Sequence, residues 1–406
     1  MRILIQGEET NLNVGDISML QMSVARLREL WSDASLEVLT GHPERLKIHL
    51  QDVEFVGVSI QPFQWFGLRK LLRECIPTKM RKRVVVLEDG FQTYIPSDIK
   101  FNNMISSAVN RADAIIFCGA GVITDQFLGV ALKRLEILEK ATHAGKPTAI
   151  FGQGIGPFEQ PQLAERIRKV LSKVDLIALR EKYNGLPLLT QCGIDSARIK
   201  VTGDDAIEMA YSVRANTLGN HIGVNLRASS YAELSPKQSQ MMQNISTALY
   251  EVAHRHNISL IPIPIDHSDH VTISELLEIS NNSQHLKTPL QVIEEVKRCR
   301  VVVTGSYHAA VFALSMGVSA ICLAKSSYYI CKCTGLVDQF GDGCEILLLE
   351  ENDIRLKEKL ETALEKALEN AQKNRQKLLQ RAQLQIRASR EAYRKFYDLV
   401  EERKKK

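Results

Sequence analysis

Short apolar runs alternate with longer amphipathic segments along most of this chain. The runs 114–117 and 301–303 are rich in β-branched residues and show no polar alternation, which is typical of strands buried on both faces of a parallel sheet. The segment 17–31 instead repeats its apolar residues every three or four positions, as an amphipathic helix does. Repeated strand-then-helix units predict parallel sheets covered by helices on both faces.

The pattern relaxes into a polar stretch near residue 215 and then resumes, so a chain of 406 residues is expected to fold as two α/β domains. We place the first Rossmann-like domain at 1–214 and the second at 215–350. Residues 351–406 are charged with apolar residues on one stripe, which predicts a long C-terminal helix packed back on the protein. Two such sheets with their strand ends facing one cleft form the arrangement called GT-B.

Composition narrows the classes of function. Contents of 45% hydrophobic and 24% charged residues are typical of a soluble globular protein. The formal net charge of +5 is small for this length, and 6% aromatic residues offer few stacking platforms, so no nucleic-acid partner is expected. A mildly basic surface favours anionic ligands.

The chain opens directly on a strand, without a secretory signal, and no run reaches the roughly 18 apolar residues that a membrane span requires. Scattered cysteines inside apolar strands favour reduced thiols and a cytoplasmic location. The lysines at 404–406 are expected to be solvated; the alternative is peripheral contact with anionic lipid at the inner face of the membrane. Neither Cys331-x-Cys333 nor the segment 266–270 is expected to bind a metal.

Residues 300–323, RVVVTGSYHAAVFALSMGVSAICL, predict a strand, a tight turn, a helix and a second strand. Ser306 is a candidate N-cap, which puts His308 in the first helical turn at the carboxyl end of a strand. Open α/β sheets bind ligands there, and backbone N–H groups at a helix start favour an anion. Lys325 and Lys332 follow within the next strand-to-helix connection. This unit is a candidate site for a phosphorylated or carboxylated substrate; a capping or packing role is the alternative for His308.

Two glycine loops each follow a buried strand and precede a helix, and they contain Gly119, Gly121, Gly152, Gly154 and Gly156. Glycine there lets the backbone approach a ligand closely, although neither loop matches a dinucleotide fingerprint or a P-loop. Arg180 ends a further strand. Asp204 and Asp205, at another strand end, are either interdomain caps or site residues. Asp16 is expected to cap the helix that begins at residue 17.

In order and spacing, these motifs resemble the polysaccharide pyruvyl transferase family from the first strand to about residue 345. The resemblance is carried by Asn13-Val-Gly-Asp16, Gly119-Ala-Gly121 with Asp125, Gly152-Gln-Gly154-Ile-Gly156-Pro157, Leu179-Arg180-Glu181, Thr202-Gly203-Asp204, Gly223-Val-Asn-Leu-Arg227 and Tyr307-His308-Ala.

The resemblance implies a GT-B-like fold and transfer of pyruvate from phosphoenolpyruvate to two hydroxyls of a sugar or lipid-linked oligosaccharide, as a cyclic ketal and without a cofactor. It maps the family's histidine onto His308 and its arginine onto Arg180. The family's lysine has no single match, because Tyr328 occupies its commonest spacing, with Lys325 just before it and Lys332 just after.

On this hypothesis His308 is the general acid that protonates the donor, because an imidazole titrates near neutral pH. Arg180 would hold phosphate or carboxylate, and Lys325 or Lys332 would neutralise the leaving phosphate. The candidate substrate-binding residues are Asn13, Gly15, Asp16, Gly119, Gly121, Gly154, Gly156, Asn225, Arg227 and Ser306.

Two other functions share this architecture. A GT-B glycosyltransferase or a sugar-nucleotide epimerase would also use an anionic donor, but Asp338 and Asp342 are only weak candidates for nucleotide recognition. A non-catalytic sugar-phosphate binding protein is the third alternative. The acceptor glycan, the regiochemistry of the ketal and the oligomeric state are left open.

Overall fold

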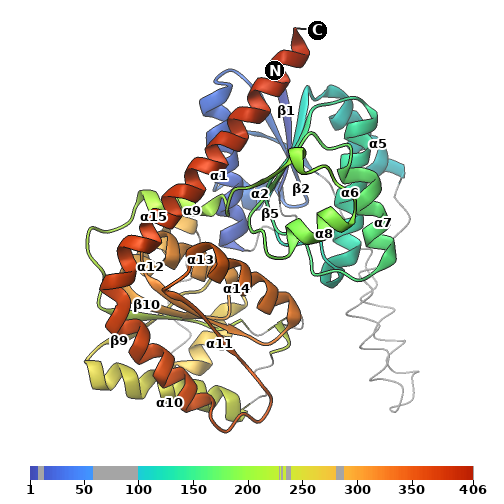
Figure 1. Ribbon diagram of the computed structural model, residues 1–406. Helices are drawn as coiled ribbons and strands as arrows, with labels where there is room; N and C mark the ends of the chain where they lie inside the picture. The colour runs from blue at the N-terminus through green and yellow to red at the C-terminus, as the bar shows by residue number, and fades with distance from the viewer. Residues whose placement is uncertain are drawn as a thin grey trace.

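The computed structural model describes residues 1–7, 13–57, 99–227, 229, 232–234, 239–279 and 288–405. Within them the chain forms two parallel β-sheets flanked by helices, and a long C-terminal helix runs along both sheets (Figure 1). This confirms the predicted architecture of two Rossmann-like α/β units followed by a long helix.

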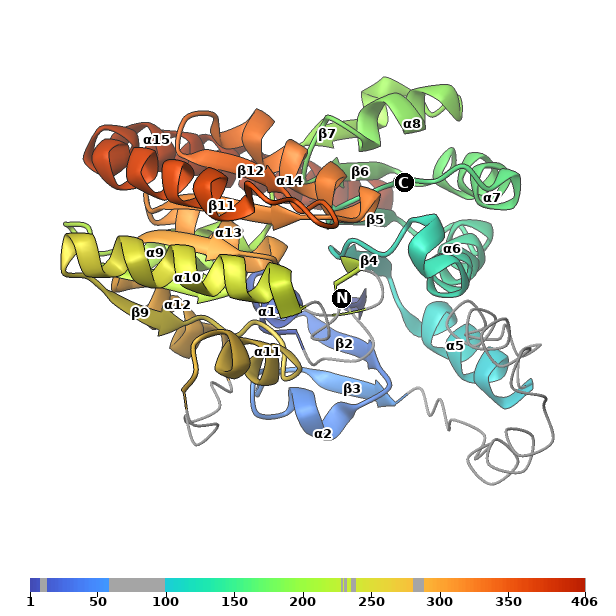
Figure 2. The same ribbon diagram turned by 90° about the horizontal axis from the view of Figure 1, so that it is seen from below.

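The first sheet has, in the described residues, seven parallel strands in the order β3-β2-β1-β4-β5-β6-β7. Their bounds are β1 Arg2–Gln6, β2 Ser35–Thr40, β3 Glu54–Gly57, β4 Ala114–Cys118, β5 Thr148–Gln153, β6 Leu176–Leu179 and β7 Ile199–Val201. One face packs on α1 (Val14–Leu30) and α9 (Ala206–Ser212). The other packs on α5 (Ile99–Arg111), α6 (Leu128–His143), α7 (Pro161–Leu171) and α8 (Gly185–Gln191), which Figure 2 shows side by side. Short elements in this half are α2 (Pro43–Leu46), η1 (Asp125–Phe127) and η2 (Ser196–Arg198).

The second sheet has, in the described part of the chain, five parallel strands in the order β12-β11-β10-β8-β9. Their bounds are β8 His221–Asn225, β9 Ser259–Pro262, β10 Cys299–Thr304, β11 Ser319–Ala324 and β12 Cys344–Leu348. Its helices are α10 Ser239–His256, α11 Asp269–Leu276, α12 Pro289–Lys297, α13 Tyr307–Ser315 and α14 Ser327–Phe340. The unit β10-α13-β11 confirms the strand, turn, helix and strand predicted for 300–323. All nine residues of α13 are buried, so this helix is held firmly between its neighbours.

The C-terminal helix α15 (Leu356–Lys404) has 49 residues and is therefore roughly 74 Å long at about 1.5 Å per residue. That length lets it contact α10, β10 and β11 of the second sheet and then β5, β6 and β7 of the first. Near its end the ring of Tyr393 stacks on Phe151 of β5, with 3.7 Å between centroids. Lys404 and Lys405 are exposed, as expected, and Lys406 lies outside the described residues.

The start of α1 corrects two expectations. The helix begins at Val14, three residues earlier than predicted, and Asn13 rather than Asp16 is its N-cap. The side-chain oxygen of Asn13 accepts a hydrogen bond of 2.9 Å from the Gly15 N–H, which satisfies a donor left free at the helix start. The Val14 N–H donates to the carbonyl of Ile265, 3.0 Å away. This contact ties the start of α1 to the second half of the chain.

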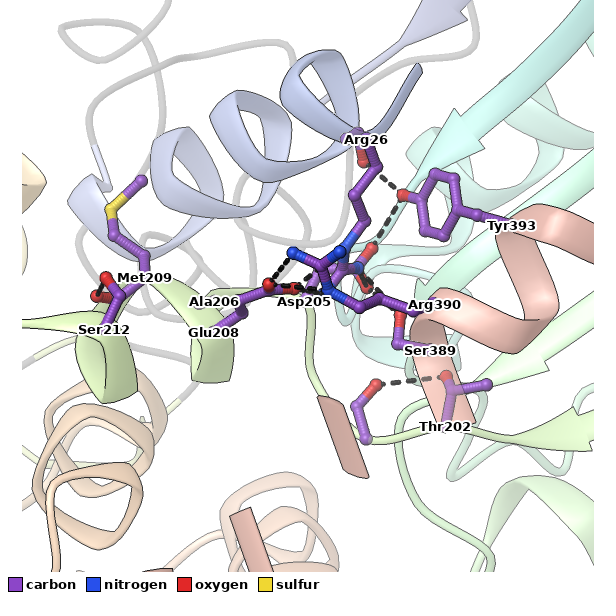
Figure 3. Close-up of polar contacts among 12 residues, drawn as sticks. Arg26, Thr202, Asp205, Ala206, Glu208, Met209, Ser212, Ser389, Arg390 and Tyr393 are labelled. Atoms are coloured by element: carbon purple, nitrogen blue, oxygen red, sulfur yellow. Dashed lines mark hydrogen bonds and ion pairs between the residues drawn. The ribbon is translucent and has the colours of Figure 1, made fainter. Parts of the chain in front are cut away.

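A buried polar network joins α1, α9 and α15 (Figure 3). The Arg26 guanidinium of α1 forms ion pairs with Asp205 and with Glu208 of α9. From α15, the hydroxyls of Ser389 and Tyr393 donate to the carboxylate of Asp205, over 2.7 and 3.0 Å. Burial opposes the charge of Arg26, but Asp205 and Glu208 outweigh it and raise the pKa of the guanidinium. The network therefore fixes α15 to the first sheet.

Asp205→Ala should lower the free energy of unfolding by about 3–5 kcal/mol, because it removes a buried partner of Arg26 and leaves that charge only partly compensated. Urea unfolding followed by circular dichroism measures the change. Asp342→Ala is the matched control, because Asp342 also pairs with α15, through Lys377, but at the exposed surface. Equal losses in both variants would contradict the role given to the buried network.

Candidate active site

Side chains from the carboxyl ends of strands in both sheets converge on one carboxylate. Arg180 follows β6 and Asp204 follows β7, whereas His308 lies in the first turn of α13 after β10. The Oδ2 atom of Asp204 is 3.6 Å from Nη1 of Arg180 and 3.7 Å from Nε2 of His308. These are ion-pair distances, longer than hydrogen bonds. The structure thus brings the two principal candidates together from opposite halves of the chain.

The carboxylate of Asp204 is held in its charged form by its neighbours. Burial alone would raise its pKa, but the adjacent His308 and Arg180, helped by the Ala206 N–H, reverse the effect and lower it. The same N–H donates to Oδ1 over 2.9 Å. For Arg180, burial also opposes the charge, and the neighbouring Tyr307 and Asp204 raise the pKa of the guanidinium in spite of it. Sequence reasoning left the role of Asp204 open; in the structure it faces this site.

Tyr307 completes what we call the guanidinium–imidazole cluster, which consists of Arg180, Asp204, Tyr307 and His308. The Arg180 guanidinium lies 4.1 Å from the centroid of the Tyr307 ring, a cation–π arrangement. Burial raises the pKa of Tyr307 well above its ordinary value, so its hydroxyl stays protonated. The sequence shows Tyr307 only as part of a motif, and nothing in that pattern indicated that it would stack on Arg180.

Four buried polar atoms of the guanidinium–imidazole cluster have no hydrogen-bond partner among the described residues. They are Arg180 Nε, Asp204 Oδ2, Tyr307 Oη and His308 Nε2. Leaving a buried polar group unpaired costs about 1–3 kcal/mol, so native structures rarely contain several together. Donors and an acceptor gathered in this way are suited to a polar ligand that supplies the missing partners.

The helix α14 places Lys332 beside the cluster. The Nζ atom of Lys332 donates to the hydroxyl oxygen of Tyr328, and that hydroxyl donates to the carbonyl of Gly121 over 2.8 Å. Burial, followed by the positive charge of Arg180, lowers the pKa of the Lys332 amine well below its ordinary value. Lys325 instead pairs with Glu351 over 2.9 Å, and no contact within the described residues joins it to the cluster. The structure therefore places only one of the two candidate lysines, Lys332, beside the guanidinium–imidazole cluster.

The predicted glycines allow close packing against the cluster. A Cβ at Gly15 would overlap the imidazole of His308, and one at Gly154 would lie 2.7 Å from Nε of Arg180. At Gly121 it would lie 2.6 Å from Nη2 of Arg180 and 2.7 Å from Nζ of Lys332. These three glycines thus admit the side chains of the site itself. By contrast, Gly119 packs on the Gly152 carbonyl and Met19, and Gly156 has φ +91° beside Leu188.

The remaining candidates shape the surroundings of His308. Arg227 makes a two-pronged ion pair with Asp269, with both contacts at 2.9 Å. Asn225 Nδ2 also donates to Asp269 over 2.9 Å, and the Ser306 N–H donates to the Thr304 hydroxyl over 2.8 Å. These bonds hold the ends of β8 and β10 and the turn that presents His308.

The half-buried Asp16 of α1 attracts the positive charges of Arg180 and Lys332, so it contributes to the electrostatics of the site. Asn13, the cap of α1, forms an isolated β-bridge with Asp266. Asn13 therefore meets the second half of the chain, two residues before Gly15, which approaches the imidazole of His308 closely. None of the helices in the described part of the chain is long and apolar enough to cross a membrane.

Solved structures of low sequence identity share the fold over nearly the whole chain. The UDP-GlcNAc 2-epimerase from Neisseria meningitidis bound to UDP-GlcNAc is 12% identical with a TM-score of 0.56, over 96% of this chain and 97% of that one. A putative UDP-N-acetylglucosamine 2-epimerase from Listeria monocytogenes is 14% identical with a TM-score of 0.55, over 96% and 93%. At such identities the likeness shows a GT-B-type fold alone.

Two sequence comparisons are more specific. The amylovoran biosynthesis protein AmsJ of Erwinia amylovora is 24% identical over 226 residues, which are 54% of this chain and 50% of that protein. The chain thus spans half the length of this curated relative. The family described as polysaccharide pyruvyl transferase matches residues 13–327, from the cap of α1 to the start of α14. This range contains the whole guanidinium–imidazole cluster, and the chain belongs to the polysaccharide pyruvyl transferase family.

Proposed function

We propose that this protein transfers pyruvate from phosphoenolpyruvate to two hydroxyls of a sugar or lipid-linked oligosaccharide and forms a cyclic ketal. Membership of the family supports a transferase that acts in polysaccharide biosynthesis. The observation that carries the choice of donor is the set of three buried atoms able to donate, Arg180 Nε, Tyr307 Oη and His308 Nε2, which have no hydrogen-bond partner among the described residues. Phosphoenolpyruvate carries a phosphate and a carboxylate, and these groups would supply acceptors to Arg180 and the α13 N-terminus.

His308 is the general acid in this proposal. It gives a proton to the methylene carbon of phosphoenolpyruvate, which turns the neighbouring carbon into an oxocarbenium-like centre. One acceptor hydroxyl adds to that centre, and the phosphate leaves with the electron pair of its carbon–oxygen bond. The second hydroxyl then closes the ketal. One of the two hydroxyl protons returns to His308, and the other ends on the phosphate.

Arg180 would bind the donor and Asp204 would balance the charge. The guanidinium is permanently charged and presents several donors, so it suits a phosphate or a carboxylate. The carboxylate of Asp204 lies 3.6 Å from Nη1 of Arg180 and 3.7 Å from Nε2 of His308, so it would balance the charge of the guanidinium beside the acid. Burial of the cluster strengthens both interactions because little water screens them.

A nucleotide-sugar donor is less well supported. Asp338 and Asp342, the weak candidates for nucleotide recognition, form ion pairs with Lys182 and Lys377 at the protein surface. Release of inorganic phosphate from phosphoenolpyruvate, measured with a panel of sugar acceptors, tests the proposal directly. Nucleotide sugars are assayed in parallel with the same acceptors. Turnover of a nucleotide sugar alone would favour a glycosyltransferase or an epimerase, and binding without turnover would favour a sugar-phosphate binding protein.

His308→Gln should lower kcat for phosphate release by about two to four orders of magnitude, because the amide keeps hydrogen bonding but does not transfer a proton. The matched control is His256→Gln, since His256 lies at the surface and pairs with Glu365. Near-normal turnover in the folded His308 variant would remove this imidazole from the mechanism.

Arg180→Lys should raise the KM for phosphoenolpyruvate by about tenfold or more, because lysine keeps the charge but loses the planar donors. Steady-state kinetics with the donor varied at fixed acceptor measures this. Arg255→Lys, at an exposed ion pair with Glu361 and Glu365, controls for the loss of a guanidinium. An unchanged donor KM in Arg180→Lys would argue against donor binding by this residue.

Gly15→Ala should lower kcat by about a hundredfold, because the added methyl overlaps the imidazole and forces His308 out of place. Gly57→Ala is the matched control, since a Cβ there makes only an ordinary contact, 3.6 Å from Cγ of Pro43. Circular dichroism verifies the fold of both variants. A fully active Gly15 variant would show that the position of the imidazole is not critical.

A further inference from the structure

We infer that Lys332 is a second proton-transfer residue, whose free amine takes the proton of the first attacking acceptor hydroxyl and passes it to the leaving phosphate, and that Tyr328 orients this amine. The inference rests on the proposed function. It explains how the hydroxyl proton that does not return to His308 reaches the phosphate. It goes beyond neutralisation of the phosphate charge, which a permanently charged side chain would perform equally well.

The geometry of α14 directs the amine into the site. Tyr328 and Lys332 are four residues apart in the helix and so lie on the same face. The Lys332 amine donates one N–H to the Tyr328 hydroxyl, which is itself anchored on the carbonyl of Gly121. This arrangement fixes the direction of Nζ while its lone pair stays available to a substrate hydroxyl. Tyr328 is therefore a positioning residue, and Lys332 is the group that would touch the substrate.

The surroundings of Lys332 favour an uncharged amine. Within the described residues, no carboxylate lies at ion-pair distance from its Nζ atom. The rings of Tyr328, Tyr329 and Tyr307, whose centroids lie 3.8, 5.6 and 5.8 Å from Nζ, attract a cation, but burial of the amine opposes them. Burial is the main cause that lowers the pKa of this amine, and two permanent cations, Arg180 after β6 and Arg227 after β8, lower it further.

Two acidic groups oppose this effect. Asp16 from α1 and the neighbouring thiol of Cys333 both favour the charged amine, but they rank below burial and Arg180. Opposing influences of this kind leave a lysine whose proton affinity is low enough for it to accept a proton and later release it. Proton-transfer groups are most efficient when their pKa lies near the working pH.

Every proton and electron pair is accounted for in the proposed steps. His308 protonates the methylene carbon, and the first hydroxyl oxygen bonds to the adjacent carbon as its proton moves to Nζ of Lys332. The carbon–oxygen bond to phosphate then breaks, the phosphate keeps the electron pair, and it takes the proton from the Lys332 ammonium. Finally the second hydroxyl oxygen bonds to the same carbon, and its proton returns to His308. Both residues regain their starting states, and the products are the ketal and hydrogen phosphate.

Lys332→Arg separates proton transfer from charge. Arginine puts a permanent cation at this position and has no free lone pair at any accessible pH. We expect kcat for phosphate release to fall by about two to four orders of magnitude, while the donor KM changes little. Lys377→Arg is the matched control, because Lys377 pairs with Asp342 at the surface. Arginine variant activity close to wild type, with Lys332→Met inactive, would overturn the inference because charge alone would then suffice.

Tyr328→Phe tests the positioning role. The phenyl ring keeps its packing, but the amine loses the hydrogen bond that directs it, so kcat should fall by about two- to tenfold at an unchanged donor KM. The acid limb of the kcat–pH profile, which reports protonation of the Lys332 amine, should also move. An unchanged pH profile and an unchanged kcat would show that Tyr328 does not orient the Lys332 amine.

Titration of the wild-type amine needs no substrate and no altered fold. Carbon-13 NMR of the lysine ε-methylenes, assigned with Lys332→Arg, should show Lys332 titrating well below about 10.4, the value of a free lysine. A titration midpoint at the ordinary value would overturn the inference. If wild-type protein releases no phosphate from phosphoenolpyruvate with any acceptor, the proposed function is what fails. If it is active and the arginine variant is too, only the Lys332 role fails.

Discussion

Two consecutive carboxylates, Asp204 and Asp205, connect the long C-terminal helix to the candidate active site. Asp205 is fully buried and is bound by Arg26 of α1 and by two hydroxyls of α15. Asp204 turns the other way and meets the imidazole and the guanidinium. Because the residues are adjacent in the chain, the contacts that fix Asp205 also fix the backbone that presents Asp204. A helix from the end of the sequence therefore helps to determine where the cluster's carboxylate lies.

This anchoring matters because the site gathers positive charge in a buried place. Arg180 and Arg227 influence the same amine of Lys332, and buried like charges are unfavourable unless acids compensate them. Asp204 compensates Arg180, and Asp269 compensates Arg227 with a two-pronged ion pair. Unpaired atoms nevertheless remain in the cluster. Well-packed elements around it, above all α13 and α15, supply the stability that such a site lacks.

Much of this architecture could be predicted from the sequence. Parallel strands all end at one edge of a sheet, and in the predicted GT-B arrangement these edges of the two sheets face one cleft. Residues that directly follow strands in different sheets, such as Arg180 and His308, were therefore expected to meet. Finer points depended on packing between distant segments. Asn13 instead of Asp16 caps α1, and the adjacent Val14 N–H also bonds to the carbonyl of Ile265 in the second half of the chain. The opposite directions of Asp204 and Asp205 followed only from the position of α15, which no local pattern encodes.

Sequence spacing alone was also unable to decide between the two candidate lysines. Lys325 directly follows a strand, as a site residue should, but at the end of β11 it meets Glu351 instead of the cluster. Lys332 lies one helical turn beyond Tyr328, and a step of four residues returns a side chain to the same face of a helix. An amine can therefore move by one turn along α14 and still reach the site, while the residue it replaces becomes its hydrogen-bond partner. Judged by sequence spacing alone, such a shift looks like the loss of the lysine. On a helix the amine still lies on the face that is turned toward the site.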